Sequence, residues 1–187
     1  TEKVVINYLN KLNIDNKELK INSRFKENDI IIMGIGGHAG MCIDIINHSS
    51  KYNIVGYIDK YNKKDMLYGL KYLGDFDNLD NLIDFGLKHL ILGIGFINNL
   101  VRRDRYYDTL IKKVNIPTII HSSSVIEPSV KIAKGCQIMA GSIIGSNCSI
   151  EENVIINSGA IISHDSIIRK SSHICPGSAI AGSVKIG

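Results

Sequence analysis

The sequence lacks several features that would assign it to a specialised class of protein. No apolar run approaches the length of a membrane span. The chain does not open with a signal peptide, in which a basic segment precedes an apolar one, so we expect a cytoplasmic protein. No Cys-x-x-Cys pair is present, which favours reduced thiols over a disulfide framework or a metal site. The net charge of +4 comes from scattered lysines and arginines, which argues against nucleic-acid binding. The four cysteines are Cys42, Cys136, Cys148 and Cys175.

The overall composition is that of an ordinary globular protein. The 187 residues are enough for one large domain or two small ones. A hydrophobic content of 44% with 21% charged residues is usual for a soluble chain. The sequence begins at Thr1 and stops inside a repeat at Gly187, so we expect the natural chain to continue beyond both ends.

A repeat of six residues occupies the second half of the chain. Four residues after each repeated isoleucine comes a small side chain, such as Cys136, Ser142 or Ala160. A period of six fits neither the 3.6 of a helix nor a series of hairpins, but it is typical of a coil of short parallel strands. Three hexads make one coil, so residues eighteen apart should stack. The repeated isoleucines are Ile126, Ile132, Ile138, Ile144, Ile150, Ile156, Ile162, Ile168, Ile174, Ile180 and Ile186.

The first half of the chain alternates strand and helix patterns, which predicts a parallel sheet with helices on both faces. We therefore expect a Rossmann-like α/β domain over residues 30–120 and a β-helix over residues 121–187, with residues 1–29 as an extension or linker. The expected strands cover residues 30–34, 53–58, 89–94 and 117–120, and the expected helices follow residue 40 and cover residues 77–85 and 98–113.

A glycine-rich turn joins the first expected strand to the first expected helix. Its sequence, Gly34-Ile-Gly36-Gly37-His38-Ala39, resembles a phosphate-binding turn, in which backbone N–H groups and a helix N-terminus favour an anion. Asp59 ends the second strand, where dinucleotide-binding domains carry an acid that binds ribose. The space before the repeat suits a mononucleotide better than NAD. The glycines could also serve only a tight turn.

The order of these motifs resembles a known bacterial family. The glycine-rich turn, then Tyr57-Ile-Asp59, then His121-Ser-Ser-Ser-Val-Ile before the hexads, is similar to the sialic-acid O-acetyltransferases and UDP-4-amino-sugar N-acetyltransferases. The resemblance covers residues 30–187 and implies a left-handed β-helix, a handedness that the spacing alone does not give. It also implies acetyl-CoA as co-substrate, a nucleotide-sugar on the first domain, and a homotrimer with active sites between subunits.

The family's functional residues can be matched to positions of this sequence. His164 and Asp165 match the family's base and its acidic partner, and His173 matches a second histidine near the acetyl thioester. Gly36, Gly37, His38 and Asp59 match the nucleotide-sugar site. His164 occupies a corner of its hexad, with Ser146 and Gly182 stacked on either side, and a backbone N–H such as that of Gly182 would serve the thioester oxygen. The alternative for His164 is a solvated corner, and for His173 a packing role.

Three rival functions remain at this stage. A carbonic anhydrase of the hexapeptide type needs three zinc-binding histidines, whereas His164 and His173 occupy different hexad positions and no third is evident. An NAD-linked dehydrogenase would leave the repeat unexplained, and a non-catalytic scaffold would use the repeat for assembly alone. We favour N-acetylation of a nucleotide-activated amino sugar for bacterial surface glycans over O-acetylation of sialic acid, because the turn and Asp59 suit a nucleotide.

Overall fold

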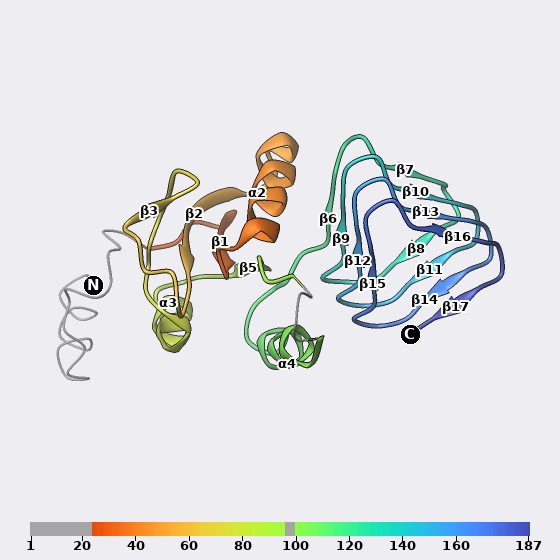
Figure 1. The fold of residues 1–187 in the computed structure, drawn as a ribbon. Coiled ribbons are helices and arrows are strands. Elements are labelled where there is room, and N and C mark those ends of the chain that lie inside the picture. Colours follow the sequence, from red (N-terminus) through yellow and green to blue (C-terminus); the bar gives the residue numbers. More distant parts are fainter. Residues whose placement is uncertain (1–23, 96–99) are drawn as a thin grey trace, which may run out of the picture.

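The computed structural model describes residues 24–95 and 100–187, so most of the expected extension over residues 1–29 lies outside the described residues. The first half contains a parallel three-stranded sheet in the order β2-β1-β5. The expected alternation of strands and helices is confirmed (Figure 1). The strands are β1 (Asp29–Met33), β2 (Asn53–Ile58) and β5 (His89–Leu92), and the helices are α2 (Gly37–Ser49), the 3-10 turn η1 (Phe76–Asn78), α3 (Leu79–Asp84) and α4 (Leu100–Leu110).

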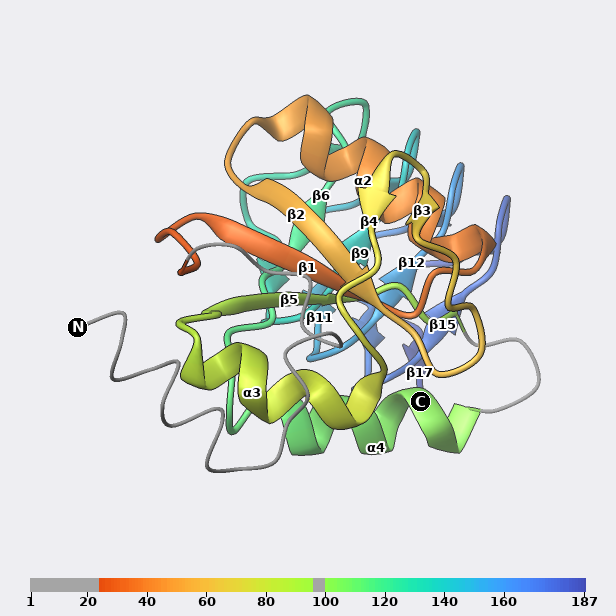
Figure 2. The same ribbon diagram turned by 90° about the vertical axis from the view of Figure 1, so that its left-hand side faces the viewer.

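Two apolar clusters form because the side chains of the buried β1 strand alternate between the two faces of the sheet. Ile30 and Ile32 pack against α2, whereas Ile31 and Met33 pack with residues of α3 and α4. Figure 2 shows α2 on one side of the sheet and α3 and α4 on the other. β1 is buried along its whole length because it is the central strand of this sheet.

A small antiparallel hairpin follows β2 and was not expected from the sequence. Its strands β3 (Met66–Leu67) and β4 (Leu70–Lys71) are joined by two residues with positive φ, Tyr68 and Gly69. Consecutive positive φ values are those of the tight turns that join hairpin strands. The sequence gives only a weak indication of this turn because tyrosine rarely adopts a positive φ.

The second half is a left-handed parallel β-helix with three faces, as the hexad spacing and the family resemblance together predict. Each face is a stack of two-residue strands eighteen residues apart. The docking face has β6 (Ile119–Ile120), β9 (Gln137–Ile138), β12 (Ile155–Ile156) and β15 (His173–Ile174). The apolar face has β7 (Val125–Ile126), β10 (Ile143–Ile144), β13 (Ile161–Ile162) and β16 (Ala179–Ile180). The polar face has β8 (Lys131–Ile132), β11 (Ser149–Ile150), β14 (Ile167–Ile168) and β17 (Lys185–Ile186).

The first strand of the β-helix is the short strand expected over residues 117–120. β6 pairs with β9 in parallel, so it belongs to the coil and not to the sheet of the first half. The reason is that Ile120 already has the hexad spacing, six residues before Ile126. The second residue of each strand points inward, where Ile138, Ile156 and the isoleucines stacked on the other faces form a single core.

The corners of the coil use a left-handed backbone conformation at regular intervals of six residues. Only glycine adopts this conformation freely, and asparagine and aspartate tolerate it better than most other residues. The corner residues with positive φ are Gly135, Gly141, Asn147, Asn153, Gly159, Asp165, Ser171, Gly177 and Ser183. Asp165 therefore stands at a position whose backbone conformation is set by the coil itself.

The three faces differ in the side chains that point outward. On the docking face, Gln137 and Ile155 are buried against the first half of the chain, where α2 contacts β6. On the apolar face, Val125, Ile143 and Ile161 are 41–53% exposed. The polar face presents Lys131, Ser149, Ile167 and Lys185. Within the described residues, no helix has both the length and the apolar character needed to cross a membrane.

Candidate functional site

A pocket of about 280 Å³ opens at the carboxyl ends of the three parallel strands. Its walls come from the loops after β1, β2 and β5, which is where open α/β sheets bind ligands. The structure places Gly36, Gly37, His38 and Asp59 together in its lining. An added Cβ at Gly36 or Gly37 would meet no atom within 4 Å, so a ligand has room to approach the start of α2.

Asp59 shapes this pocket through its backbone contacts. Its Oδ2 accepts a hydrogen bond from the N–H of Ile35 at 2.9 Å. Its Oδ1 accepts hydrogen bonds from the N–H groups of Tyr61 and Asn62 at 2.7 and 2.8 Å. The side chain is buried, and both oxygens hold loops in place. The arrangement therefore gives Asp59 a structural task beside the ribose contact expected from the sequence.

His38 joins the pocket to the β-helix. Its Nε2 lies 2.7 Å from Oε1 of Gln137 on β9, and the Nε2 of Gln137 donates to the carbonyl of Leu92 at 2.9 Å. Burial lowers the pKa of His38 to about 4, against the opposite effect of its hydrogen bond to Gln137. The imidazole is therefore neutral at physiological pH.

Arg103 is a buried cation that sequence analysis missed. It lies on α4 with no exposed surface, and its Nη1 donates to the carbonyls of Leu92 and Ile94 at 3.1 and 2.6 Å. These bonds fix the end of β5, which forms one wall of the pocket. Burial lowers the pKa of Arg103 to about 10, which still leaves it charged at neutral pH. Arg103 belongs to a charged stretch of α4, so nothing in the sequence separates it from the exposed Arg105.

The histidine–aspartate pair lies at the corner between the apolar and polar faces. His164 Nδ1 is 2.7 Å from Oδ2 of Asp165, and the Nδ2 of Asn147 donates to Oδ1 of Asp165 at 3.2 Å. The hydrogen bond from His164, together with that from Asn147, lowers the pKa of the Asp165 carboxyl. An ionised carboxylate accepts the Nδ1–H, which leaves Nε2 of His164 free to accept a proton. The two side chains are 66% and 50% exposed, in agreement with the expected outward corner.

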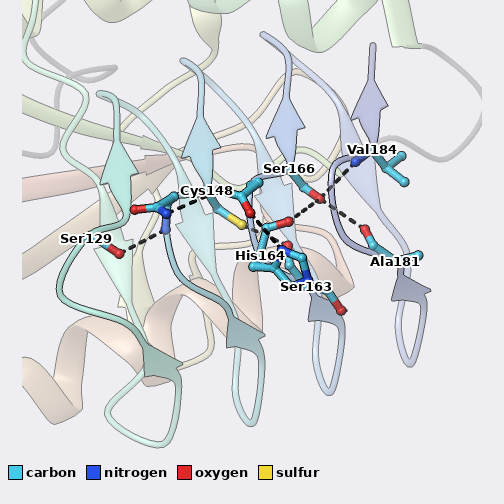
Figure 3. Close-up of polar contacts among 9 residues, drawn as sticks. Ser129, Cys148, Ser163, His164, Ser166, Ala181 and Val184 are labelled. Atoms are coloured by element: carbon cyan, nitrogen blue, oxygen red, sulfur yellow. Dashed lines mark hydrogen bonds and ion pairs between the residues drawn. The ribbon is translucent and has the colours of Figure 1, made fainter.

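The coils beside His164 hold its turn in place (Figure 3). The hydroxyl of Ser166, which has no exposed surface, donates to the carbonyl of Ala181 at 3.0 Å and accepts from the N–H of Val184 at 3.2 Å. The thiol of Cys148 donates to the carbonyl of Ser163 at 3.0 Å. These buried polar contacts connect the coils before and after the turn, so the imidazole projects from a rigid support.

Gly182 lies directly against the imidazole of His164. A Cβ added at Gly182 would stand 2.6 Å from Cε1 and 2.7 Å from Nε2 of the ring. The φ of Gly182 is not in the left-handed region, so the requirement for glycine there is one of space alone. The sequence predicted a small neighbour at this position, and the structure shows that the ring occupies the space.

His173 lies on β15 of the docking face, away from His164. Its Nε2 accepts a hydrogen bond from the Nδ2 of Asn157 at 3.0 Å, and the Oδ1 of Asn157 accepts the N–H of Ser158 at 2.8 Å. Burial and the charge of Arg103 lower the pKa of His173. The structure thus brings His173 near the side of the molecule that holds the pocket, and it does not bring His173 together with His164.

The pocket and the histidine–aspartate pair of one chain are well separated. The first half of the chain covers the docking face, whereas the turn after β13 that carries the pair lies at the corner opposite that face (Figure 1). Where the structure describes the chain, no group of three or more histidine, cysteine or acidic side chains is arranged to hold a metal ion. A single chain thus keeps the pocket and the His164–Asp165 pair apart.

Comparisons with known proteins match both halves of the chain. The family model of the PglD N-terminal domain matches residues 29–109, and that of the bacterial transferase hexapeptide (six repeats) matches residues 129–164. The search of curated proteins gave no significant match.

Two solved structures illustrate the similarity. A point mutant of GDP-perosamine N-acetyltransferase from Caulobacter crescentus, in complex with CoA and GDP-perosamine, is 29% identical, with a TM-score of 0.77 over 86% of this chain and 74% of that one. The acetyltransferase domain of PglB from Neisseria gonorrhoeae, in complex with acetyl coenzyme A, is 23% identical, with a TM-score of 0.77 over 87% and 77% of the two chains. At 23% identity, the similarity to the PglB domain shows the fold alone.

Proposed function

This chain belongs to the hexapeptide-repeat acyltransferases, and we propose that it transfers the acetyl group of acetyl-CoA to the amino group of a nucleotide-activated amino sugar. The observation that carries the proposal is the His164–Asp165 pair. Its 2.7 Å contact engages Nδ1 and leaves Nε2 of the exposed imidazole to accept a proton at a rigid corner of the β-helix. The pocket on the parallel sheet supplies the second requirement, a place for a nucleotide beside a glycine-rich turn.

The chemistry follows from the state of His164. The amine nitrogen attacks the thioester carbonyl carbon, so that a C–N bond forms and the C–S bond breaks. Nε2 of His164 takes the proton that the nitrogen loses and can return it to the departing CoA sulfur. Asp165 stabilises the resulting imidazolium, and a positioned base of this kind contributes roughly 10²–10⁴ in rate. No covalent acyl-enzyme is required.

Assembly as a homotrimer would complete the site. The apolar face carries Val125, Ile143 and Ile161 in one exposed column, whereas the docking face is covered and the polar face is charged. A column of apolar side chains of this kind marks a protein–protein contact. His164 follows the β13 strand of the apolar face, so a copy packed there would bring its own pocket toward the pair. A ring in which this face meets the first half of the next subunit is a head-to-tail arrangement that closes with cyclic symmetry.

Two features favour N-acetylation and a cytoplasmic location. N-acetylation is favoured over O-acetylation because the structure that is 29% identical is described as an N-acetyltransferase in complex with GDP-perosamine. A cytoplasmic location fits the four cysteines, all of which are free thiols. Gly182 and His173 are proposed to contact acetyl-CoA, Gly182 through its backbone beside the base and His173 from a neighbouring subunit.

The proposal is tested by measuring CoA release with a thiol reagent. The full-length chain is mixed with acetyl-CoA and a panel of GDP-, UDP-, dTDP- and CMP-linked amino sugars, with the His164→Ala variant as the control for background hydrolysis. We expect one nucleotide-sugar to give turnover that the variant lacks, and mass spectrometry to show an added acetyl group. Equal CoA release by the two proteins on every sugar would refute the proposal.

A further inference from the structure

Gln137 is a buried polar residue on the docking face of the β-helix that the mechanism does not use. Only 1% of it is exposed, and it contacts the first turn of α2 and the last residue of β5 in the other half of the chain. Its carboxamide lies between the imidazole of His38 at 2.7 Å and the carbonyl of Leu92 at 2.9 Å. A buried amide with both ends engaged holds its neighbours in one arrangement.

The directions of these hydrogen bonds fix the protonation state of His38. The carbonyl of Leu92 can only accept, so the Nε2 amide group of Gln137 must face it and donate. The Oε1 atom then faces His38 and can only accept, so the Nε2 of His38 carries the proton. A neutral imidazole that is protonated at Nε2 has a bare lone pair at Nδ1. The Nη1 of Arg103 donates to the same carbonyl, which therefore accepts two hydrogen bonds.

We propose that Gln137 is a positioning residue that holds His38 as its Nε2–H tautomer, so that Nδ1 accepts a hydrogen bond from a hydroxyl or ammonium group of the substrate. This inference rests on the proposed function, because it takes the substrate to bind in the pocket that His38 lines. Two further charged or titratable groups act on His38, namely Arg103 of α4 and His173 of β15, and both disfavour its protonation.

The assignment divides the pocket between two kinds of ligand group. A bare Nδ1 repels an ionised phosphate oxygen and attracts a donor, so the phosphates belong at the backbone N–H groups where α2 begins, at Gly36 and Gly37. His38 lies between that turn and the β-helix, and it recognises a donor on the ribose or on the sugar. Through Gln137, the β-helix thereby controls the protonation of His38, a ligand-binding residue of the other half of the chain.

The first test measures the tautomer directly in the ligand-free, full-length chain. Long-range ¹H–¹⁵N spectra distinguish protonated from bare ring nitrogens, and the His38 signals are assigned by their loss in His38→Asn. We expect a protonated Nε2 and a bare Nδ1 from pH 8 down to about pH 5, because the pKa is held near 4. A proton on Nδ1, or an imidazolium at pH 6, would overturn the proposal. This result does not depend on which substrate the enzyme uses.

Two substitutions at Gln137 separate positioning from a merely structural role. Gln137→Met removes the acceptor and should allow His38 to populate both tautomers. Gln137→Glu supplies a carboxylate, which should favour the imidazolium and raise the pKa of His38. His164 lies at the corner opposite the docking face, and its signals should not move in either variant. Identical His38 spectra in all three folded proteins would show that Gln137 does not control the ring.

Kinetics then identify the donor. In Gln137→Met we expect the KM for the nucleotide-sugar to rise about tenfold, as for the loss of one hydrogen bond, with kcat within about threefold and the KM for acetyl-CoA unchanged. Weaker binding of the free nucleoside diphosphate as well assigns the donor to the ribose, whereas unchanged binding assigns it to the sugar. An unchanged KM in both His38→Leu and Gln137→Met would overturn the inference. Failure of the wild type to acetylate any nucleotide-sugar would refute the proposed function and leave the tautomer result standing.

Discussion

At the scale of single residues, the proposed base depends on the space beside it. The ring of His164 fills the volume that a side chain at position 182 would need, and Asp165 holds the ring from the other side. The φ of Gly182 lies outside the left-handed region, so a small side chain there should disturb the ring of His164 without straining the backbone.

We therefore expect Gly182→Ala to lower kcat by about tenfold or more, because the added methyl group must displace the ring from the position in which its Nδ1 contacts Asp165. The melting temperature should stay within a few degrees of that of the wild type. Gly177→Ala on the same coil is the control for turnover, because its added Cβ has open space. Its positive φ makes a lower melting temperature expected in that variant. Wild-type turnover by Gly182→Ala would show that the ring position in the structure is not the active one.

Asp165 has two separate tasks, one chemical and one conformational. Its carboxylate accepts a hydrogen bond from Nδ1–H of His164, and its φ of 58° places it in the left-handed region that recurs every six residues from Gly135 to Ser183. Asp165→Gly keeps the backbone conformation and removes the acceptor, so kcat should fall by about 10²-fold with the melting temperature almost unchanged. Asp165→Val should lose both the acceptor and the favoured backbone conformation. Its melting temperature should fall by several degrees, since a branched residue in the left-handed region costs about 1–2 kcal/mol. Full activity in Asp165→Gly would remove the carboxylate from the mechanism.

Some residues of the site could be predicted from the sequence and others could not. His164 and Asp165 have a fixed place in the hexad, so their outward position followed from the spacing and their role from the family resemblance. Gln137 occupies an outward hexad position whose neighbours are known only after the first half of the chain packs on the docking face. Its partner His38 is 99 residues away in sequence, and no local pattern connects the two.

At the scale of elements, the hexad register predicts that adjacent isoleucines point in opposite directions, one into the core and one outward. Ile162 points into the core with no exposed surface, whereas Ile161 points outward and is 42% exposed. Ile162→Asp should prevent folding, because an unpaired carboxylate would be buried among the stacked isoleucines. Ile161→Asp should keep the circular dichroism spectrum of the wild type. A folded Ile162→Asp protein would show that the register is wrong.

The strength of the local signal decided which elements could be predicted. The repeat specifies each strand of the β-helix because an inward isoleucine and a small corner residue recur in every hexad. The strand over residues 117–120 was expected in the first half because the expected repeat began at Ile126, although Ile120 already has the hexad spacing and β6 pairs with β9. The hairpin of β3 and β4 was missed because Tyr68 takes a conformation that tyrosine seldom adopts.

At the scale of the whole molecule, each face of the β-helix has its own environment. The apolar face is proposed to pack on a second copy, and Ile161→Asp should therefore convert the trimer to monomers with loss of turnover. Ile167→Asp on the polar face is the matched control and should remain trimeric. Analytical ultracentrifugation of both folded variants distinguishes these outcomes. A trimer in Ile161→Asp, or monomers in both variants, would assign the contact elsewhere.

The central claim is that each active site joins the His164–Asp165 pair of one subunit to the pocket of another. It is tested by co-expressing His164→Ala with a variant whose pocket is blocked, Gly37→Glu, which places a carboxylate where phosphate should bind. Each variant alone should be inactive. Random mixing in a trimeric ring should restore about a quarter of wild-type turnover, because that fraction of interfaces joins an intact pair to an intact pocket. No restored activity in mixed trimers, with both variants folded and assembled, would contradict the account.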